Sequence, residues 1–293
     1  MKTEMIYGGK MISKENKNEI ILKMNQKKIK KIQQKYILKY IELNTELFNF
    51  LNIEELTQRI LENFSGVSIN LTSFIYNDYG QYVSTTGKIL LSPKLYFGIN
   101  KKYKESVFFH ELDHCACSPI TVKKEYYKYK SEIKKKYKIF HKMIPDFILS
   151  EIFLKVNYEG TISGIADLKR EEGHIVQKLT YGIKLENYLN EGITSLKQKI
   201  YSDKLNIEFH NENDFFCGGR IGAECLANVI GFKNLIYFHF NNNLEKIQEL
   251  FYNSTGIKLE ELVLKCIKYD RKRDKKTFEE LKEFIEKIYK FEN

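Results

Sequence analysis

Apolar side chains recur every three or four positions along most of the chain, which is the spacing of helices that bury one face. In the first fifty residues this spacing runs through a lysine-rich segment, so residues 15–48 predict one or two basic helices. The run KKIKKIQQK inside that segment is typical of a solvated helix face. Other helices are predicted over 53–64, from about 103 to Pro119, and over 122–143, 146–156 and 186–201.

A different pattern occupies residues 66–92, where β-branched and aromatic residues are separated by the turn-like sequences Asn-Asp-Tyr-Gly and Thr-Thr-Gly. This pattern predicts two or three short antiparallel strands, of which the last is GKILLSP. Further along, YEGTISGIADL is expected to be extended. Apolar faces predict helices throughout 219–291, and Thr277 with Glu280 resembles a capping box at the start of the last one.

These elements predict an α+β protein that is mainly helical, with a small antiparallel sheet and a helical C-terminal lobe. A chain of 293 residues, 43% of them hydrophobic, is long enough for one large domain or two packed lobes. The predicted organisation is a basic helical extension, a central domain with a helical insertion at about 122–156, and the C-terminal lobe. Their bounds are 1–48, 49–205 and 206–293.

The formal net charge of +10 raises the question of an anionic partner. Lysines are spread along the chain among glutamates and arginines are few, whereas recognition of bases and phosphates usually uses arginine as well. Nucleic-acid binding is therefore not expected as the main role. The N-terminus has no apolar signal region and no run reaches the ~18 apolar residues of a membrane span. We expect a cytoplasmic protein without a membrane partner, and export without a cleavable signal stays open.

The five cysteines have an odd count and irregular spacing, which argues against a disulfide framework. Cys115 and Cys117 stand close to a candidate metal motif. Two residues apart on a helix, their side chains would point about 200° from one another, which is poor geometry for binding one metal. We predict buried free thiols instead.

The residues that carry chemistry are His110 to His114, which read HELDH. Histidines four positions apart lie on one face of a helix and can bind one Zn²⁺ at about 2.0–2.1 Å. Glu111 would project beside the metal as a general base. Nearby apolar residues predict a helix that buries the opposite face and offers the histidines to a cleft. These are Phe108, Phe109, Leu112 and Ala116. The alternative is an exposed helix with two unrelated histidines.

A second motif, LNEGITS, occupies residues 189–195. With HELDH it resembles the gluzincin metallopeptidases, the group related to thermolysin. In that group HExxH lies on one helix and a downstream NExxxD helix supplies a glutamate. Asn190 and Glu191 match the start of the second motif, and EGIT resembles the form in bacterial members of uncharacterised function. The resemblance extends loosely over about 70–265, with GKILLSP in the place of the edge strand that borders the cleft.

The resemblance implies a zincin-like domain in which the sheet packs on the HExxH helix. It further implies one zinc ion per chain, bound by His110, His114 and Glu191. At the last position of the second motif this chain has Ser195 where the family has an aspartate that orients a histidine ligand. Asn190 and Ser195 are thus candidates for contacts behind the ligands, and Asp113 is a possible substitute for the missing aspartate.

The implied activity is hydrolysis of peptide bonds in peptides or proteins. Glu111 would take a proton from a zinc-bound water and pass it to the leaving amine. Tyr201 and His210 are candidates to stabilise the oxyanion. His239, in the sequence YFHFN, is expected to be a packed structural residue.

Two other functions stay open at this point. One is a catalytically degenerate zinc-binding regulatory protein, which Ser195 and the long insertion would suit. The other is a basic helical protein associated with nucleic acid. The sequence leaves open the substrate, the oligomeric state, and whether the basic N-terminal helix is a pro-like cover, a partner surface or a structural support.

Overall fold

The structure is a computed structural model of the chain. The described residues are 12–69, 80–97, 101–118, 120–137, 144, 148–150, 152–153, 179–180, 183–207 and 217–290. The chain divides into two compact units, Met1–Lys123 and Lys124–Asn293. This division falls inside the predicted segment 49–205, and the three predicted domains stay a prediction. Among the described residues, no helix has the length and apolar character needed to cross a membrane.

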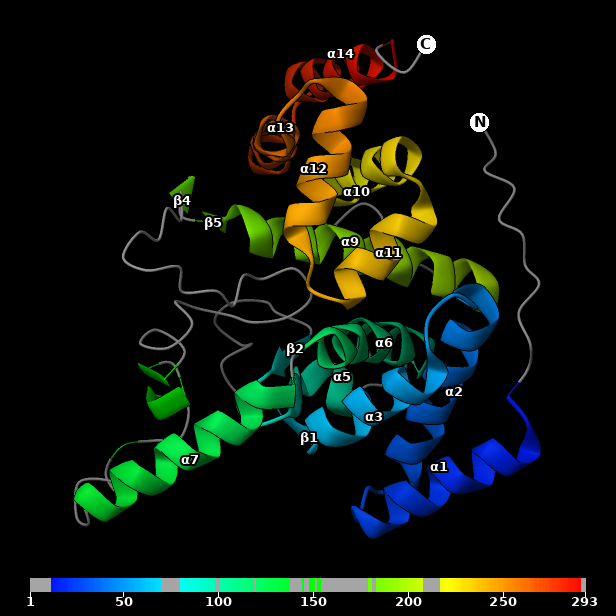
Figure 1. The fold of residues 1–293 in the computed structure, drawn as a ribbon, viewed down its shortest axis with the longest axis vertical. Helices are drawn as coiled ribbons and strands as arrows, with labels where there is room; N and C mark the ends of the chain where they lie inside the picture. Colours follow the sequence, from blue (N-terminus) through cyan, green and yellow to red (C-terminus); the bar gives the residue numbers. More distant parts are fainter. Residues whose placement is uncertain are drawn as a thin grey trace. The chain divides into compact units, whose positions relative to one another are not determined.

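The first unit contains the helices that surround the HELDH motif (Figure 1). Apart from the short helix Pro93–Phe97, which was not predicted, they agree with the predicted spans. The asparagine before α3 caps it, since Asn52 accepts hydrogen bonds from the backbone N–H groups of Glu54 and Glu55 at 2.9 and 3.2 Å. The helices are α1 (Lys14–Gln26), α2 (Lys31–Leu47), α3 (Ile53–Asn63), α5 (Pro93–Phe97) and α6 (Lys101–Cys117).

The basic N-terminal segment forms two helices, and its lysine run faces solvent. All five lysines of residues 27–35 are exposed, whereas Met24, Ile37 and Tyr40 are fully buried. The prediction of a solvated charge run is confirmed. Because α2 packs directly on α6, this segment supplies part of the core of the first unit, which favours structural support among its predicted roles.

A three-stranded sheet belongs to the same unit, with β1 (Gly66–Ile69), β2 (Gly80–Val83) and β3 (Lys88–Leu91) in the order β1-β3-β2. β2 pairs antiparallel with β3, but β1 pairs parallel with it, so the predicted all-antiparallel sheet is wrong and the sheet is mixed. The predicted edge position of GKILLSP is also wrong, because β3 has a partner on both sides. A central strand suits KILL, in which Ile89 and Leu91 are buried.

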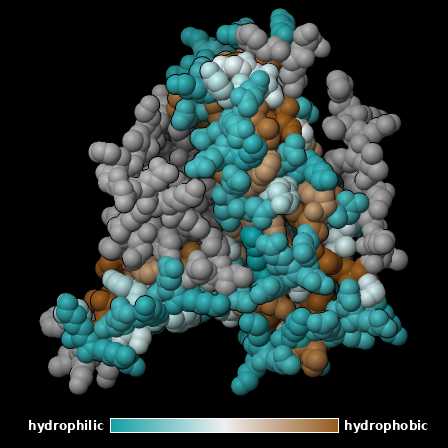
Figure 2. Space-filling model, viewed as in Figure 1, coloured by the Kyte–Doolittle hydropathy of each residue, from teal (hydrophilic) through white to brown (hydrophobic). Residues whose placement is uncertain are grey.

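The helix α7 (Ile120–Lys136) begins before the division and continues into the second unit. It matches the predicted insertion helix, although residues 138–143 of that prediction lie outside the described residues. Val122 and Tyr126 are buried, and most of its lysines are exposed. Figure 2 shows the resulting hydrophilic surface along the helix. The predicted helix 146–156 is described only in part, and the segment YEGTISGIADL is not described.

Where the second unit is described, its regular structure is helical apart from the short antiparallel pair β4 (Leu179–Thr180) and β5 (Ile183–Lys184). Its main packing is between α9 and α10, and α13 packs on α10. Each of these helices corresponds to a predicted apolar face. They are α9 (Leu185–Leu205), α10 (Cys217–Ile230), α11 (Phe232–Phe240), α12 (Leu244–Thr255), α13 (Leu259–Lys272) and α14 (Lys275–Lys290).

The predicted capping box at the start of α14 is wrong by three residues. Asp274 caps this helix, since its Oδ1 accepts a hydrogen bond of 2.7 Å from the backbone N–H of Thr277. Thr277 is therefore already inside the helix, and Glu280 binds Lys268 instead of the helix start. Asp274 offers a charged acceptor to the N–H groups of the first turn, and aspartate caps a helix better than threonine.

Candidate metal centre

The helix α6 is held in the first unit by polar contacts at the C-terminal end of the HELDH motif and just after it. The hydroxyl of Tyr40 on α2 donates to Oδ1 of Asp113 at 2.7 Å. The side-chain amide of Asn63 donates to the backbone carbonyls of Cys115 and Ser118 at 2.9 and 2.7 Å. These carbonyls lie at the end of α6 and have no acceptor role within the helix, so Asn63 supplies the bonds that the helix end lacks.

Aromatic packing against α2 and α3 covers one side of α6. The ring of Phe108 contacts Tyr36 and Phe64, and Phe109 contacts Tyr40, with centroid separations of 5.3 to 6.3 Å. The helix was predicted to have one buried and one open face, but the buried surface is much larger than predicted. From residue 106 to 118 every side chain is buried except His110, which is half-buried.

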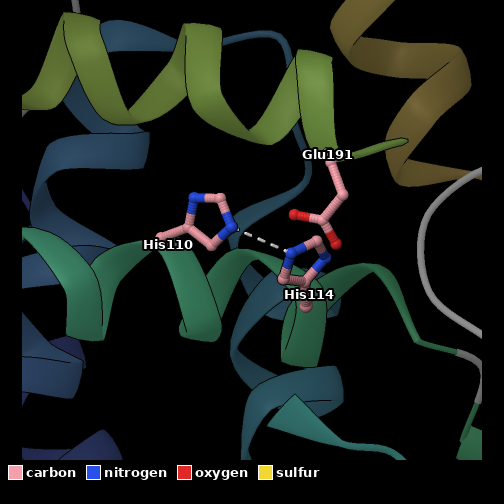
Figure 3. A group of neighbouring side chains, drawn as sticks. All are labelled: His110, His114 and Glu191. Carbon is pink, nitrogen blue, oxygen red and sulfur yellow. Dashed lines mark hydrogen bonds between the residues drawn. The ribbon is translucent and has the colours of Figure 1, made fainter. Parts of the chain in front are cut away.

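The two histidines of the motif face one another on α6. Their Nε2 atoms are 3.1 Å apart and their ring planes are inclined by 72° (Figure 3). Two nitrogens bound to one tetrahedral zinc at 2.0–2.1 Å would be about 3.3 Å apart. The observed separation is close to that value. It also suits a hydrogen bond between two neutral imidazoles, so the distance alone fits both situations.

Glu111 is buried beside the edge strand β2 of the sheet. Its carboxylate lies against Gly80: a Cβ atom built at Gly80 would stand 2.8 Å from Oε1 of Glu111 and 2.8 Å from Cγ1 of Val107. Real Cβ contacts are not this short. Because residue 80 has no side chain, the Glu111 carboxylate can occupy this position. The sequence pattern did not predict a role for this glycine.

Cys115 and Cys117 are buried free thiols, as predicted. Burial raises the pKa of the Cys115 thiol to about 12, and burial also raises the pKa of the neighbouring Tyr82 hydroxyl. A thiol with such a pKa stays protonated at neutral pH. Because zinc binds the thiolate, Cys115 is a poor metal ligand in this environment.

The second motif lies on α9, where the segment from residue 188 to 197 is buried with one exception. That exception is Glu191, which is half-buried and is drawn on α9 in Figure 3. Asn190 is buried, and its Oδ1 lies 2.7 Å from Nε2 of His239 on α11. Ser195 is buried on the same helix. The expectation that His239 is packed is confirmed, but its hydrogen bond to the second motif was not foreseen.

The two candidates for oxyanion stabilisation stay predictions. Tyr201 is fully buried on α9, ten residues after Glu191. Ten residues of α-helix span about 15 Å, so this position does not favour a role beside the Glu191 carboxylate. His210 lies outside the described residues.

Comparison with known proteins gives no further information, because no protein-family model, curated protein or solved structure matches this chain. A function must therefore be argued from the residues of the two motifs.

Proposed function

We propose that this chain is a zinc-dependent metallopeptidase in which His110, His114 and Glu191 bind the metal. The observation that supports this most is the approach of the two imidazole Nε2 atoms to 3.1 Å on α6, close to their separation on a shared tetrahedral zinc. The proposal requires that the Glu191 carboxylate, in the second unit, lies within metal-binding distance of the His110 and His114 imidazoles in the first unit. That proximity is part of the proposal.

The chemistry of the donors favours zinc. Two imidazole nitrogens and one carboxylate oxygen form a set of ligands that zinc accepts in catalytic sites with one open position. Asp113, Cys117 and His239 are a second set of metal-ligand types among the described residues. Within their own units, Asp113 already accepts the Tyr40 hydroxyl and His239 already binds Asn190, so we prefer the first set.

When bound at such a site, zinc lowers the pKa of a coordinated water towards about 7 and polarises the scissile carbonyl. Glu111 acts as the general base that removes the proton from the attacking water and later delivers it to the leaving amine. The backbone of Gly80 supports its carboxylate from the sheet side. Burial of Glu111 keeps bulk water from competing for that proton.

The test compares wild type with Glu111→Gln, His114→Ala and Glu191→Ala. Metal content is measured by mass spectrometry after reconstitution with Zn²⁺, and cleavage is measured on a mixture of unstructured peptides. We expect one zinc per chain in wild type, zinc without cleavage in Glu111→Gln, and loss of zinc in the other two variants. Glu105→Gln is the matched control, because it makes the same change on α6, where Glu105 pairs with Lys39.

Each alternative predicts a different result. A zinc-binding regulatory protein would retain zinc in wild type and in Glu111→Gln but would cleave no peptide in either form. A chain whose histidines are unrelated to metal would bind no zinc in wild type, which contradicts the proposal. If Glu191→Ala binds zinc as tightly as wild type, the ligand set is wrong.

A further inference from the structure

The residues next to Glu191 on α9 contact three other helices of the second unit, α10, α11 and α13. On its N-terminal side, the hydroxyl of Tyr188 binds the carboxylate of Asp270 on α13. The same carboxylate accepts the backbone N–H groups of Gly218 and Gly219 at the start of α10, at 2.7 and 3.3 Å. One aspartate thus connects α9, α10 and α13 within one turn of Glu191.

On the C-terminal side, two backbones are in direct contact. A Cβ atom built at Gly192 would lie 2.4 Å from the carbonyl oxygen of Gly219, so no side chain fits between α9 and α10 at this point. The distance between the two helices is therefore set by the main chain, next to Glu191.

Between these two contacts lies the hydrogen bond that His239 donates to Asn190. Both side chains are buried, and the Asn190 Oδ1 accepts from Nε2 of His239 at 2.7 Å. With Nε2 as the donor, the histidine carries its proton on this nitrogen. If the two side chains moved apart, a buried polar group would lose its hydrogen bond, which is costly. The two side chains are therefore held in hydrogen-bonding geometry.

This hydrogen bond restricts the rotation of α9 about its own axis. Consecutive side chains point about 100° apart on a helix, so fixing residue 190 also fixes the direction of residue 191. At about 5–6 Å from the axis, a rotation of 20° would displace a carboxylate by about 2 Å. Metal–ligand distances tolerate deviations of only about 0.2 Å.

We infer that His239 is a positioning residue that orients the Glu191 carboxylate through Asn190. The inference rests on the proposed function, because it gives His239 a role only if Glu191 binds the metal. His239 differs in role from Tyr188 and Gly192. The contacts of Tyr188 and Gly192 set the position of α9, whereas the hydrogen bond at residue 190 sets the direction in which residue 191 points.

The test uses two substitutions of His239 in the full chain. His239→Leu keeps the bulk and removes the donor, whereas His239→Gln keeps an N–H group that can reach the Asn190 oxygen. Zinc affinity is measured by competition with a chromophoric chelator, and the ligand geometry by the visible spectrum of the Co²⁺ form. We expect His239→Leu to weaken zinc binding by roughly 10–100-fold and to change the Co²⁺ spectrum. His239→Gln should restore most of both.

Thr255→Val is the control for general loss of stability. The Thr255 hydroxyl is buried in the same unit, where it donates to the Phe251 carbonyl at 2.7 Å and accepts from the Ile257 N–H. Its loss should lower the unfolding midpoint without changing zinc affinity or the Co²⁺ spectrum. Should His239→Leu not fold, Asn190→Ala removes the same bond from the other end.

The results distinguish the inference from the function on which it rests. If Glu191→Ala binds zinc as tightly as wild type, the proposed ligand set fails. If Glu191→Ala loses zinc but His239→Leu binds it like wild type, only the inference fails. Equal weakening in His239→Leu and Thr255→Val, or no rescue by His239→Gln, would also overturn it.

Discussion

The hydroxyl of Tyr40 donates a hydrogen bond of 2.7 Å to the carboxylate of Asp113, and both side chains are 0% exposed. This bond joins α2, in the basic N-terminal segment, to the residue that precedes His114 on α6. A buried carboxylate is costly unless it is hydrogen-bonded. The N-terminal segment thus helps to hold the helix that carries the histidine pair.

Tyr40→Phe should destabilise the first unit by about 1–3 kcal/mol, because it deprives the buried Asp113 carboxylate of a donor. Urea unfolding followed by circular dichroism measures the change. Tyr36→Phe is the matched control, since Tyr36 lies on the same helix and packs its ring on Phe108 but is only half-buried. Equal losses in the two variants would contradict a specific role of the Tyr40 hydroxyl.

Gly80→Ala should reduce peptide cleavage by roughly 10–100-fold while zinc content stays near one per chain. The new Cβ would meet Oε1 of Glu111 at 2.8 Å and displace the carboxylate, and a displacement of about 1 Å can cost 10²-fold in rate. Gln81→Ala, at the exposed neighbouring position of β2, should keep full activity. Loss of zinc in Gly80→Ala would instead mean that α6 itself has moved.

Alkylation of the folded protein by iodoacetamide at pH 8 should modify Cys217 first and leave Cys115 unmodified. Cys217 is half-buried, whereas the other four cysteines are buried. Burial raises the pKa of Cys115 to about 12, so at pH 8 nearly all of it is the unreactive protonated thiol. Peptide mass spectrometry identifies the modified positions, and denatured protein should react at all five. Early modification of Cys115 would show that its surroundings open easily.

Asp274→Ala should lower the melting temperature more at pH 7 than at pH 3. The hydrogen bonds from Thr277 hold the pKa of Asp274 below its usual value. A carboxylate with a lowered folded pKa stabilises the fold above its unfolded pKa of about 3.9, and this contribution is lost as the pH falls through the folded value. Thermal melts at the two pH values test this. Glu279→Ala removes an exposed carboxylate from the same helix and should show no comparable difference.

Helices were the part of the fold that the sequence predicted best. The span of α3 follows directly from a run of regular apolar spacing, which depends only on neighbours along the chain. The direction of β1 was not predictable in this way. Its parallel pairing with β3 joins residues about twenty positions apart, and no local pattern distinguishes it from an antiparallel pair.

The relative placement of the two histidines was predictable, because their motif fixes the spacing. His110 and His114 had to share a helix face, and their nitrogens do approach one another. The supporting residues were not predictable, because their roles arise from contacts between distant segments. Tyr40 reaches Asp113 across 73 positions and His239 reaches Asn190 across 49. Gly80 has no side chain by which a pattern could identify it.

The contact between Gly192 and Gly219 has a consequence for how relatives of this chain can be recognised. Gly192 accepts no larger residue without separating α9 from α10, since the added atom would lie 2.4 Å from the carbonyl oxygen of Gly219, whereas an atom added at Gly219 would lie 3.3 Å from Cα of Gly192 and needs a smaller adjustment. Surface lysines can be exchanged with little penalty, but Gly192 cannot. A glycine at residue 192, directly after Glu191, should therefore persist in distant relatives after overall similarity has faded.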